Sequence, residues 1–245
     1  MNATNKTSGR PRKKPARETG GGEKPRFLSR EVLLDAAMAV VERDGSDKLT
    51  IRALGADLGV DHTAIYRHFR SMDELLLALA DRLLATALAD FEPAPDWRTT
   101  VRELSIRVRR AYLTHPRLAV LAAARVTRGD AEFRIVDLGV AALKAAGMDD
   151  RAAARYYLAW AHLVLGATVL EAITLGLDEH ARAGDLAATT REYLAAPPSQ
   201  YPHLAAAAPY FADAVTEDRF ELGLDLLLDA VELHANKQTP TSTSE

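Results

Sequence analysis

Apolar residues recur at intervals of three and four positions along most of the chain, which is the period of an amphipathic α-helix. Leu33, Ala36, Ala37, Val40 and Val41 are the first example. No segment keeps up the strict alternation of apolar and polar residues that indicates a half-buried β-strand, and no internal repeat is present. Hydrophobic residues make up 48% of the 245 residues, so a sizeable core can form. The sequence therefore predicts an all-α protein of one large or two small domains.

The N-terminal part contains closely spaced helix boundaries. Four residues there can accept a hydrogen bond from the first turn of a helix, and we predict them as N-caps: Ser29, Thr50, Asp61 and Ser71. Gly59 can adopt the left-handed conformation that ends a helix, which separates two short helices. The Ser71-x-x-Glu74 spacing forms a capping box before a longer helix over about 72–91. We therefore expect three short helices over 29–75, followed by a linking helix.

A larger helical bundle is expected over 92–236. Its predicted helices cover 97–114, 117–127, 130–147, 150–177 and 209–236. Between the last two, the segment RAGDLAATTREYLAAPPSQYPHLAAAAP is rich in proline and alanine, and we expect a long connection without helices. Residues 1–28 and 237–245 are expected to be disordered tails, the first of them basic, because they contain little to bury.

The charge distribution indicates an anionic partner for the front of the chain only. Residues 1–70 hold 14 Lys/Arg and 9 Asp/Glu, a net charge of +5, whereas residues 71–245 hold 17 and 25, a net charge of −8. The absence of cysteine excludes disulfides and thiolate metal sites. We find no apolar run that approaches the roughly 20 residues of a membrane span and no secretory signal, so no membrane association is expected.

Sequence motifs of enzymes are absent. The chain has no cysteine nucleophile, no G-x-S-x-G, no phosphate-binding loop and no H-E-x-x-H, and its seven histidines are scattered. We therefore predict a protein that is not an enzyme and that needs neither a metal nor a cofactor.

Residues 50–69 predict a helix-turn-helix. Two short helices meet at a glycine-containing turn, and each has one apolar stripe that can pack inward. Polar residues then remain on the outer face of the second helix: His62, Thr63, Tyr66 and Arg67. A helix of this width fits the major groove of DNA, where its N-terminal residues reach base edges.

This segment resembles the DNA-binding domain of the TetR family of transcriptional regulators. The resemblance covers about 55 residues and is carried by ERDG at the end of the first helix, LTIRALGADLGV and IYRHFRSMDELL. The rest of the chain resembles a TetR-type regulatory domain at LAWAHLVLGATVLEAI (158–173) and FELGLDLLLDAVE (220–232). The expected architecture is an N-terminal helix-turn-helix domain joined to a C-terminal bundle that dimerises.

The resemblance implies that nine residues contact DNA: Thr50, Arg52, His62, Thr63, Ala64, Tyr66, Arg67, His68 and Arg70. Thr50 and Arg52 are expected to hold phosphates, and His62, Thr63 and Arg67 to face bases. Ala64 is expected to make an apolar contact with a thymine methyl. Tyr66 and His68 are expected to contact phosphates.

Alternatives remain open at three of these positions. The Tyr66 ring can instead pack on the first helix with its hydroxyl in water. His68 can instead interact with the helix dipole, and the two readings are about equal. The family often has lysine where this chain has Met72, and Arg70 is expected to take over that contact.

The basic tail supports a second hypothesis. SGRPRKKPAR (8–17) resembles an AT-hook, a motif that lies in a narrow minor groove. A generic basic extension that raises nonspecific affinity by counterion release is the favoured reading. The alternative function for the whole chain is a ligand-independent architectural DNA binder that uses this tail.

The resemblance also implies a homodimer and a ligand pocket. The apolar helices 150–177 and 209–236 are expected to form a four-helix interface, although both can instead be internal core helices. Candidate ligand contacts inside 97–177 are Trp97, Tyr112, Arg125, Phe133, Tyr156, Trp160, His162 and Glu171. Tetracycline is not the expected ligand, because its metal site in this family needs a histidine near 119–126, and none is present.

The function that these features favour is a sequence-specific repressor. As a homodimer it would bind a palindromic operator on double-stranded DNA and leave it when an unidentified small molecule binds. The expected location is the bacterial cytoplasm, in association with the nucleoid.

Overall fold

The computed structural model describes residues 28–45, 48–214 and 218–238, and within these ranges the chain is all-α. The helices are α1 (Arg30–Asp44), α2 (Ile51–Leu58), α3 (His62–Tyr66), α4 (Met72–Ala87), α5 (Trp97–Leu113), α6 (Pro116–Ala122), α7 (Asp130–Ala145), α8 (Asp150–Gly176), α9 (Glu179–Leu194), α10 (Pro202–Ala214) and α11 (Arg219–Gln238). The predicted fold class, a helix-turn-helix followed by a helical bundle, is confirmed. The AT-hook-like segment lies outside the described residues.

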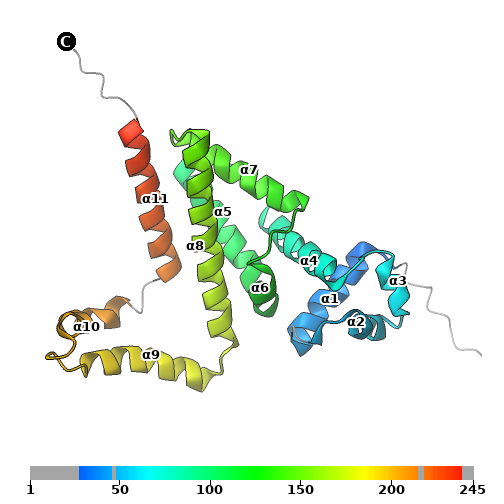
Figure 1. Cartoon of the computed structure of the whole chain (residues 1–245), viewed down its shortest axis with the longest axis horizontal. Coiled ribbons are helices and arrows are strands. Elements are labelled where there is room, and N and C mark those ends of the chain that lie inside the picture. Colours follow the sequence, from blue (N-terminus) through cyan, green and yellow to red (C-terminus); the bar gives the residue numbers. More distant parts are fainter. Residues whose placement is uncertain (1–27, 46–47, 215–217, 239–245) are drawn as a thin grey trace, which may run out of the picture.

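Helix α4 connects two parts of the molecule. Helices α1–α3 form a small unit at one end, and α4 leads from it into the body built by α5–α8 and α11 (Figure 1). Helix α4 contacts α1 on one side and α5, α6 and α7 on the other. The buried core is continuous across this connection, since one hydrophobic cluster includes residues of both parts. Helix α1 also contacts α6 directly, so the small unit is joined to the body through both α4 and α6.

The four predicted N-caps form as expected. The side chains of Ser29, Thr50, Asp61 and Ser71 accept hydrogen bonds from backbone amides in the first turns of α1, α2, α3 and α4. Gly59 ends α2 with φ 65° and ψ 29°, in the left-handed region. These local signals fix the short helices, which are too short to be stable by themselves.

Ion pairs hold α11 against α5. Arg98 pairs with Asp229 at 2.6 Å and Arg102 with Glu221 at 2.6 Å. Farther along α5, Arg109 pairs with Glu171 of α8 at 2.8 Å. The side of α11 that faces the body is therefore polar at its edge and apolar at its centre, where Leu224 and Leu228 are buried.

The prediction of a helix-free connection before the last helix was wrong. Helices α9 and α10 occupy most of it, and residues 209–214 belong to α10 rather than to the final helix. Of the four prolines in this segment, Pro197 and Pro198 lie between α9 and α10. The other two do not prevent a helix: Pro202 is the first residue of α10, and Pro209 lies inside it. Alanine, the best helix former, is abundant in the segment. The final helix continues to Gln238, so the predicted C-terminal tail begins later than expected.

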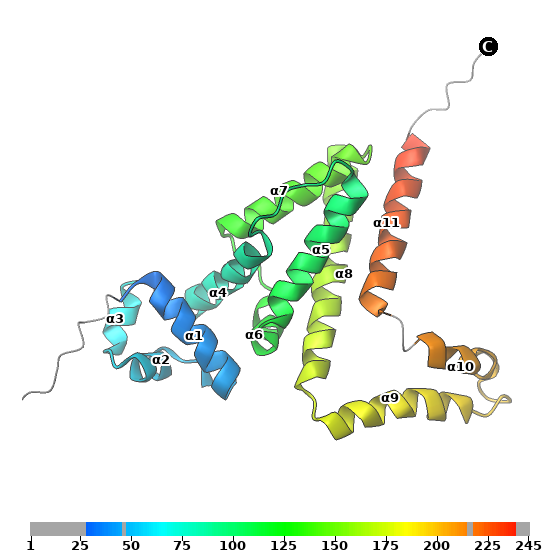
Figure 2. The same cartoon turned by 180° about the vertical axis from the view of Figure 1, so that it is seen from behind.

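The α9–α10 pair projects from the body (Figures 1 and 2). The two helices pack on each other, with Tyr193 and Phe211 in edge contact at 5.0 Å. Helix α9 has no buried residue, and Leu186 and Leu194 are exposed.

Helix α8 corrects a second expectation. It is 27 residues long and, by length and composition alone, apolar enough to span a membrane, so the statement that no apolar run approaches that length was too strong. One such helix is weak evidence for a membrane segment, because helices of soluble proteins pass the same test. Only 22% of the most apolar 18-residue stretch of α8 is buried. Much of the apolar surface of this helix is therefore not covered by the rest of the subunit.

Candidate nucleic-acid interface

The turn between α2 and α3 depends on glycines. The amide of Val60 donates to the carbonyl of Gly55 at 2.9 Å, which folds the chain back directly after α2. Gly55 is buried, and a Cβ there would lie 3.0 Å from the Val60 carbonyl oxygen. A Cβ at this position would require the Val60 carbonyl to shift by a few tenths of an ångström, so the small residue suits the close approach of the two helices.

Helix α3 is held in place by buried side chains and is capped at its start. Ile65 and Phe69 are fully buried together with Leu54 of α2. Asp61 accepts a hydrogen bond from the Thr63 amide at 2.8 Å. Hydrogen bonds from the Thr63 hydroxyl and amide lower the pKa of Asp61, so the cap stays ionised at neutral pH. The outward direction of the remaining α3 side chains is thereby fixed.

All nine predicted DNA contacts lie between Thr50 and Arg70 on this unit. Seven of them are exposed: Thr50, Arg52, His62, Thr63, Tyr66, Arg67 and Arg70. The other two, Ala64 and His68, are partly buried. The structure thus brings the nine together on one small unit, and their contacts with DNA remain a prediction.

The arginines of this surface have free charges. The guanidinium groups of Arg52, Arg67 and Arg70 make no hydrogen bond or ion pair with any residue in the described ranges. In α1, by contrast, Arg30 pairs with Glu74 and Arg43 with two aspartates. The free cations are available to phosphates or bases, because no carboxylate neutralises them.

Two rings lie at the exposed face. Tyr66 is 49% exposed and lies edge-on to His62, with ring centroids 6.5 Å apart. About half of the Tyr66 side chain is thus open to solvent, and its predicted contact with a phosphate stays a prediction. The end of α3 is held by Arg30, which donates to the His68 carbonyl at 3.1 Å and stacks 4.2 Å from the Phe69 ring centroid.

A small cavity lies inside the body. The volume open to the centre of a water-sized molecule is about 70 Å³. Its lining is mostly apolar, with three aromatic rings and two charged groups: Leu84, Val108, Tyr112, Ala123, Arg125, Glu132, Ile135, Tyr157, Trp160, Ala161, Val164 and Leu165. The Trp160 indole is fixed by a 2.7 Å hydrogen bond from Nε1 to Ser105 Oγ.

Three of the predicted ligand residues line this cavity, namely Tyr112, Arg125 and Trp160. The others lie elsewhere. Trp97 and Phe133 are outside the lining, Tyr156 packs on His234, the His162 Nδ1 lies 2.7 Å from the Leu158 carbonyl on an exposed side of α8, and Glu171 pairs with Arg109.

Sequence reasoning missed Tyr157 and Glu132. Tyr157 precedes Trp160 by three residues and Ala161 by four, so helical spacing places all three on one face. That spacing was the available signal for Tyr157. Glu132 has no comparable signal, because its position depends on the packing of α7 against α4.

The loop between α6 and α7 connects the cavity to α4; we call residues 125–129 the clamp loop. At its start, Arg125 pairs with Asp73 in the first turn of α4 at 2.5 Å. Two residues later, the Thr127 hydroxyl lies 2.8 Å from Asp81 Oδ1, two turns farther along α4. The amide of Glu132 also donates to Asp81 Oδ1, at 3.1 Å.

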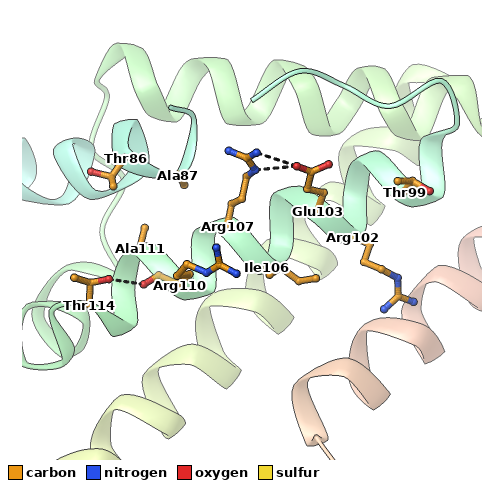
Figure 3. A pocket seen from close by; sticks show the side chains of 10 residues that line it. All are labelled: Thr86, Ala87, Thr99, Arg102, Glu103, Ile106, Arg107, Arg110, Ala111 and Thr114. Atoms are coloured by element: carbon orange, nitrogen blue, oxygen red, sulfur yellow. Dashed lines mark hydrogen bonds and ion pairs between the residues drawn. The ribbon is translucent and has the colours of Figure 1, made fainter. Parts of the chain in front are cut away.

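An open groove of about 430 Å³ lies over α5 and the end of α4. Figure 3 shows Arg107 and Glu103 pointing toward each other in this groove, while Arg102 points away toward α11. Arg107 also donates to the Ala89 carbonyl at 2.8 Å. Both arginines are thus engaged in ion pairs, Arg107 within α5 and Arg102 with α11.

Two family descriptions match the chain. Residues 33–79 match bacterial regulatory proteins of the tetR family, and residues 91–234 match the tetracyclin repressor-like C-terminal domain. An HTH-type transcriptional repressor of Mycobacterium tuberculosis is 29% identical over 210 residues, covering 82% of this chain and 79% of its own length. With the exposed cationic helix-turn-helix, these matches define a DNA-binding transcriptional regulator. Within that class, the chain belongs to the TetR family, as its sequence predicted.

Solved structures share the fold. BioQ with its double-stranded DNA operator has a TM-score of 0.60 and 25% identity, over 84% of this chain and 99% of BioQ. ActR of Streptomyces coelicolor, in complex with actinorhodin, has a TM-score of 0.74 over 85% of this chain and 98% of ActR. At 24% identity, the likeness to ActR shows the fold alone.

Proposed function

We propose that this regulator is a homodimeric repressor that binds a palindromic operator and is released from it by a small molecule. The observation that carries the DNA part is the exposed, unpaired cationic face of α2–α3. The operator complex of BioQ supports it. Such a protein would act in the cytoplasm, at the nucleoid.

The exposed stripes of α8 and α11 support a dimer. The two helices pack against each other. On α8, Leu158, Leu170 and Ile173 are exposed, and on α11 Leu226 and Leu233 are more than 60% exposed. A second copy that covers both stripes would bury them in a four-helix interface. The apolar surface of α8 that is exposed in one subunit would then no longer contact water. The same symmetry would place two α3 helices in successive major grooves.

The cavity and the clamp loop support release by a ligand. Ligand sites usually measure about 300–1,000 Å³, so the present 70 Å³ is a contracted state. Expansion would move Arg125, and with it the contact to α4. To switch the dimer almost completely, the ligand must bind the DNA-incompetent form better by about 5.5 kcal/mol. The complex of ActR with actinorhodin supports a ligand, and the lack of a histidine in the cavity lining argues against metal-bound tetracycline.

DNase footprinting on the DNA flanking the chain's own gene tests the proposal. The purified protein should protect a palindromic site whose half-sites are about one helical turn, or a small multiple of it, apart. Protection should persist when residues 1–26 are deleted. Loss of all binding on that deletion would instead support the architectural DNA binder.

Gly129→Ala is expected to weaken operator binding about tenfold by forcing the clamp loop away from α4. The added Cβ would lie 2.1 Å from Asp81 Cγ. The carboxylate cannot easily move aside, because it accepts hydrogen bonds from Thr127 and Glu132. Fluorescence anisotropy with labelled operator measures the effect.

The second change Asp81→Ala makes room for the added methyl group. The double variant should therefore bind operator more tightly than Gly129→Ala alone. Gly184→Ala, where nothing lies within 4 Å of the added Cβ, is the control and should behave as wild type. Wild-type operator affinity in Gly129→Ala would contradict a clamp role for the loop.

A further inference from the structure

Two phenol hydroxyls at the cavity have no protein partner. Tyr112 is only 2% exposed, yet its hydroxyl makes no hydrogen bond with any residue of the described ranges. The hydroxyl of Tyr157, which is partly buried, makes none either. Neither hydroxyl oxygen is among the fully buried side-chain atoms without a partner. Each hydroxyl is therefore accessible to a partner, and both residues line the cavity.

The negative charge of Glu132 affects the pKa of both tyrosines. Burial raises the pKa of Tyr157 to about 12, and the charge of Glu132 adds to the rise. Burial, followed by Glu132 and Asp81, raises the pKa of Tyr112 still further. Both side chains are consequently neutral O–H donors at physiological pH. The cavity lining thus combines two donors and one carboxylate acceptor.

Glu132 is held in place with acceptor capacity left over. Its Oε2 accepts from the Arg128 amide at 2.7 Å and lies 3.0 Å from the Thr127 hydroxyl. A carboxylate offers about four acceptor positions, so a ligand O–H can still be accommodated. Apart from Arg125, the rest of the lining, including the fixed face of Trp160, is apolar or aromatic.

We propose that the cavity binds a neutral phenol, a hydroxylated aromatic ring. The ligand oxygen accepts the Tyr112 O–H, the ligand hydroxyl hydrogen is donated to Glu132, and the ring packs among the aromatic and aliphatic walls. This assignment rests on the proposed ligand-responsive function and names the chemical class of the ligand.

Charged rings fit less well. A carboxylate would be repelled by Glu132, and the one cation in the lining, Arg125, is engaged by Asp73 at 2.5 Å. An ammonium group has no lone pair to accept the tyrosine hydrogens. A plain hydrocarbon would leave both hydroxyls without a partner.

The test compares four compounds that share a methyl-substituted benzene ring and differ in the group opposite the methyl: p-cresol, toluene, 4-methylbenzoate and 4-methylbenzylammonium. Of the two tryptophans in the chain, Trp97 lies outside the cavity lining. In the full-length Trp97→Phe variant, the emission of Trp160 therefore reports cavity occupancy, and calorimetry confirms the affinity. We expect p-cresol to bind at least about tenfold more tightly than each of the others, since each lacks one half of the donor–acceptor match. Equal or tighter binding of any of the three, or no binding of p-cresol, overturns the proposal.

Tyr112→Phe separates a ligand contact from a structural role. The affinity for p-cresol should fall about fivefold, while the melting temperature should not fall, because the hydroxyl has no protein partner to lose. Tyr210→Phe, at an exposed position of α10, should change neither. A lower melting temperature with unchanged p-cresol affinity would assign the hydroxyl to the fold and overturn the proposal.

The assay contains no DNA, so it can fail independently of the proposed function. A protein that protects its operator but does not bind p-cresol refutes only the ligand class. A protein that binds p-cresol but protects no operator refutes the repressor.

Discussion

Replacing Thr63 and Arg67 together with alanine should lower the affinity of the dimer for its operator by at least about a hundredfold, since a good base contact contributes about 1–3 kcal/mol and each subunit loses two. Both side chains are exposed on α3, and the Arg67 guanidinium has no protein partner in the described ranges. The fold should survive, because Ile65 and Phe69 anchor the helix. Anisotropy with specific and scrambled duplexes measures the loss, which should be much larger for the specific site.

A matched control separates base contacts from capping. Thr99 is the third residue after the N-cap Asp96 of α5, and Thr63 is the second residue after the N-cap Asp61 of α3. Each donates its backbone amide to the capping carboxylate at 2.8 Å. Thr99→Ala with Arg134→Ala therefore removes an equivalent threonine and an exposed arginine far from the interface. This double variant should keep full operator affinity. Unchanged specific affinity in the α3 variant would refute the assignment of α3 as the recognition helix.

Leu226→Glu should convert the dimer to monomers and reduce operator affinity at least about a hundredfold. Leu226 is 64% exposed on α11, so the substitution has little effect on the isolated subunit. In the proposed interface, two glutamates would lie near the symmetry axis, desolvated and close to each other. A monomer contacts one half-site only and loses the second set of contacts. Sedimentation velocity measures the mass, and anisotropy measures the affinity.

Val120→Glu is the control for this change. Val120 is 46% exposed on α6, outside both stripes, and the variant should remain dimeric and bind operator as wild type does. A Leu226→Glu protein that still sediments as a dimer would refute the interface at α8 and α11, whatever its affinity for DNA.

The helix-turn-helix could be predicted because its signals are local. Caps, the left-handed Gly59 and the buried Ile65 and Phe69 lie within 20 residues, and each acts on its immediate neighbours. The exposed face follows as the complement of the apolar stripe. The α9–α10 pair could not be predicted in the same way. Helix α9 has no buried face to give a periodic signal. In α10, Pro202 and Pro209 suggested breaks where the structure has a helix start and an interior position.

The cavity depended on long-range packing. Tyr112, Arg125 and Trp160 were predicted as ligand contacts, but nothing in the sequence places them together or removes His162 and Glu171 from the set. His162 and Glu171 attracted attention as polar residues in an apolar helix. In the structure, His162 lies on an exposed side of α8, and Glu171 forms an ion pair with Arg109.

By itself, the sequence determined the all-α class, the caps and turn of the helix-turn-helix, the face that α3 presents, and the family. All of these depend on spacing along one or two neighbouring helices. Only the tertiary structure decided that the clamp loop contacts α4 beside the cavity, and that the charge of Glu132 lies near Tyr112 and Tyr157. Those contacts join residues about 20 to 50 positions apart, and the docking of helices sets their distances, which local periodicity does not encode.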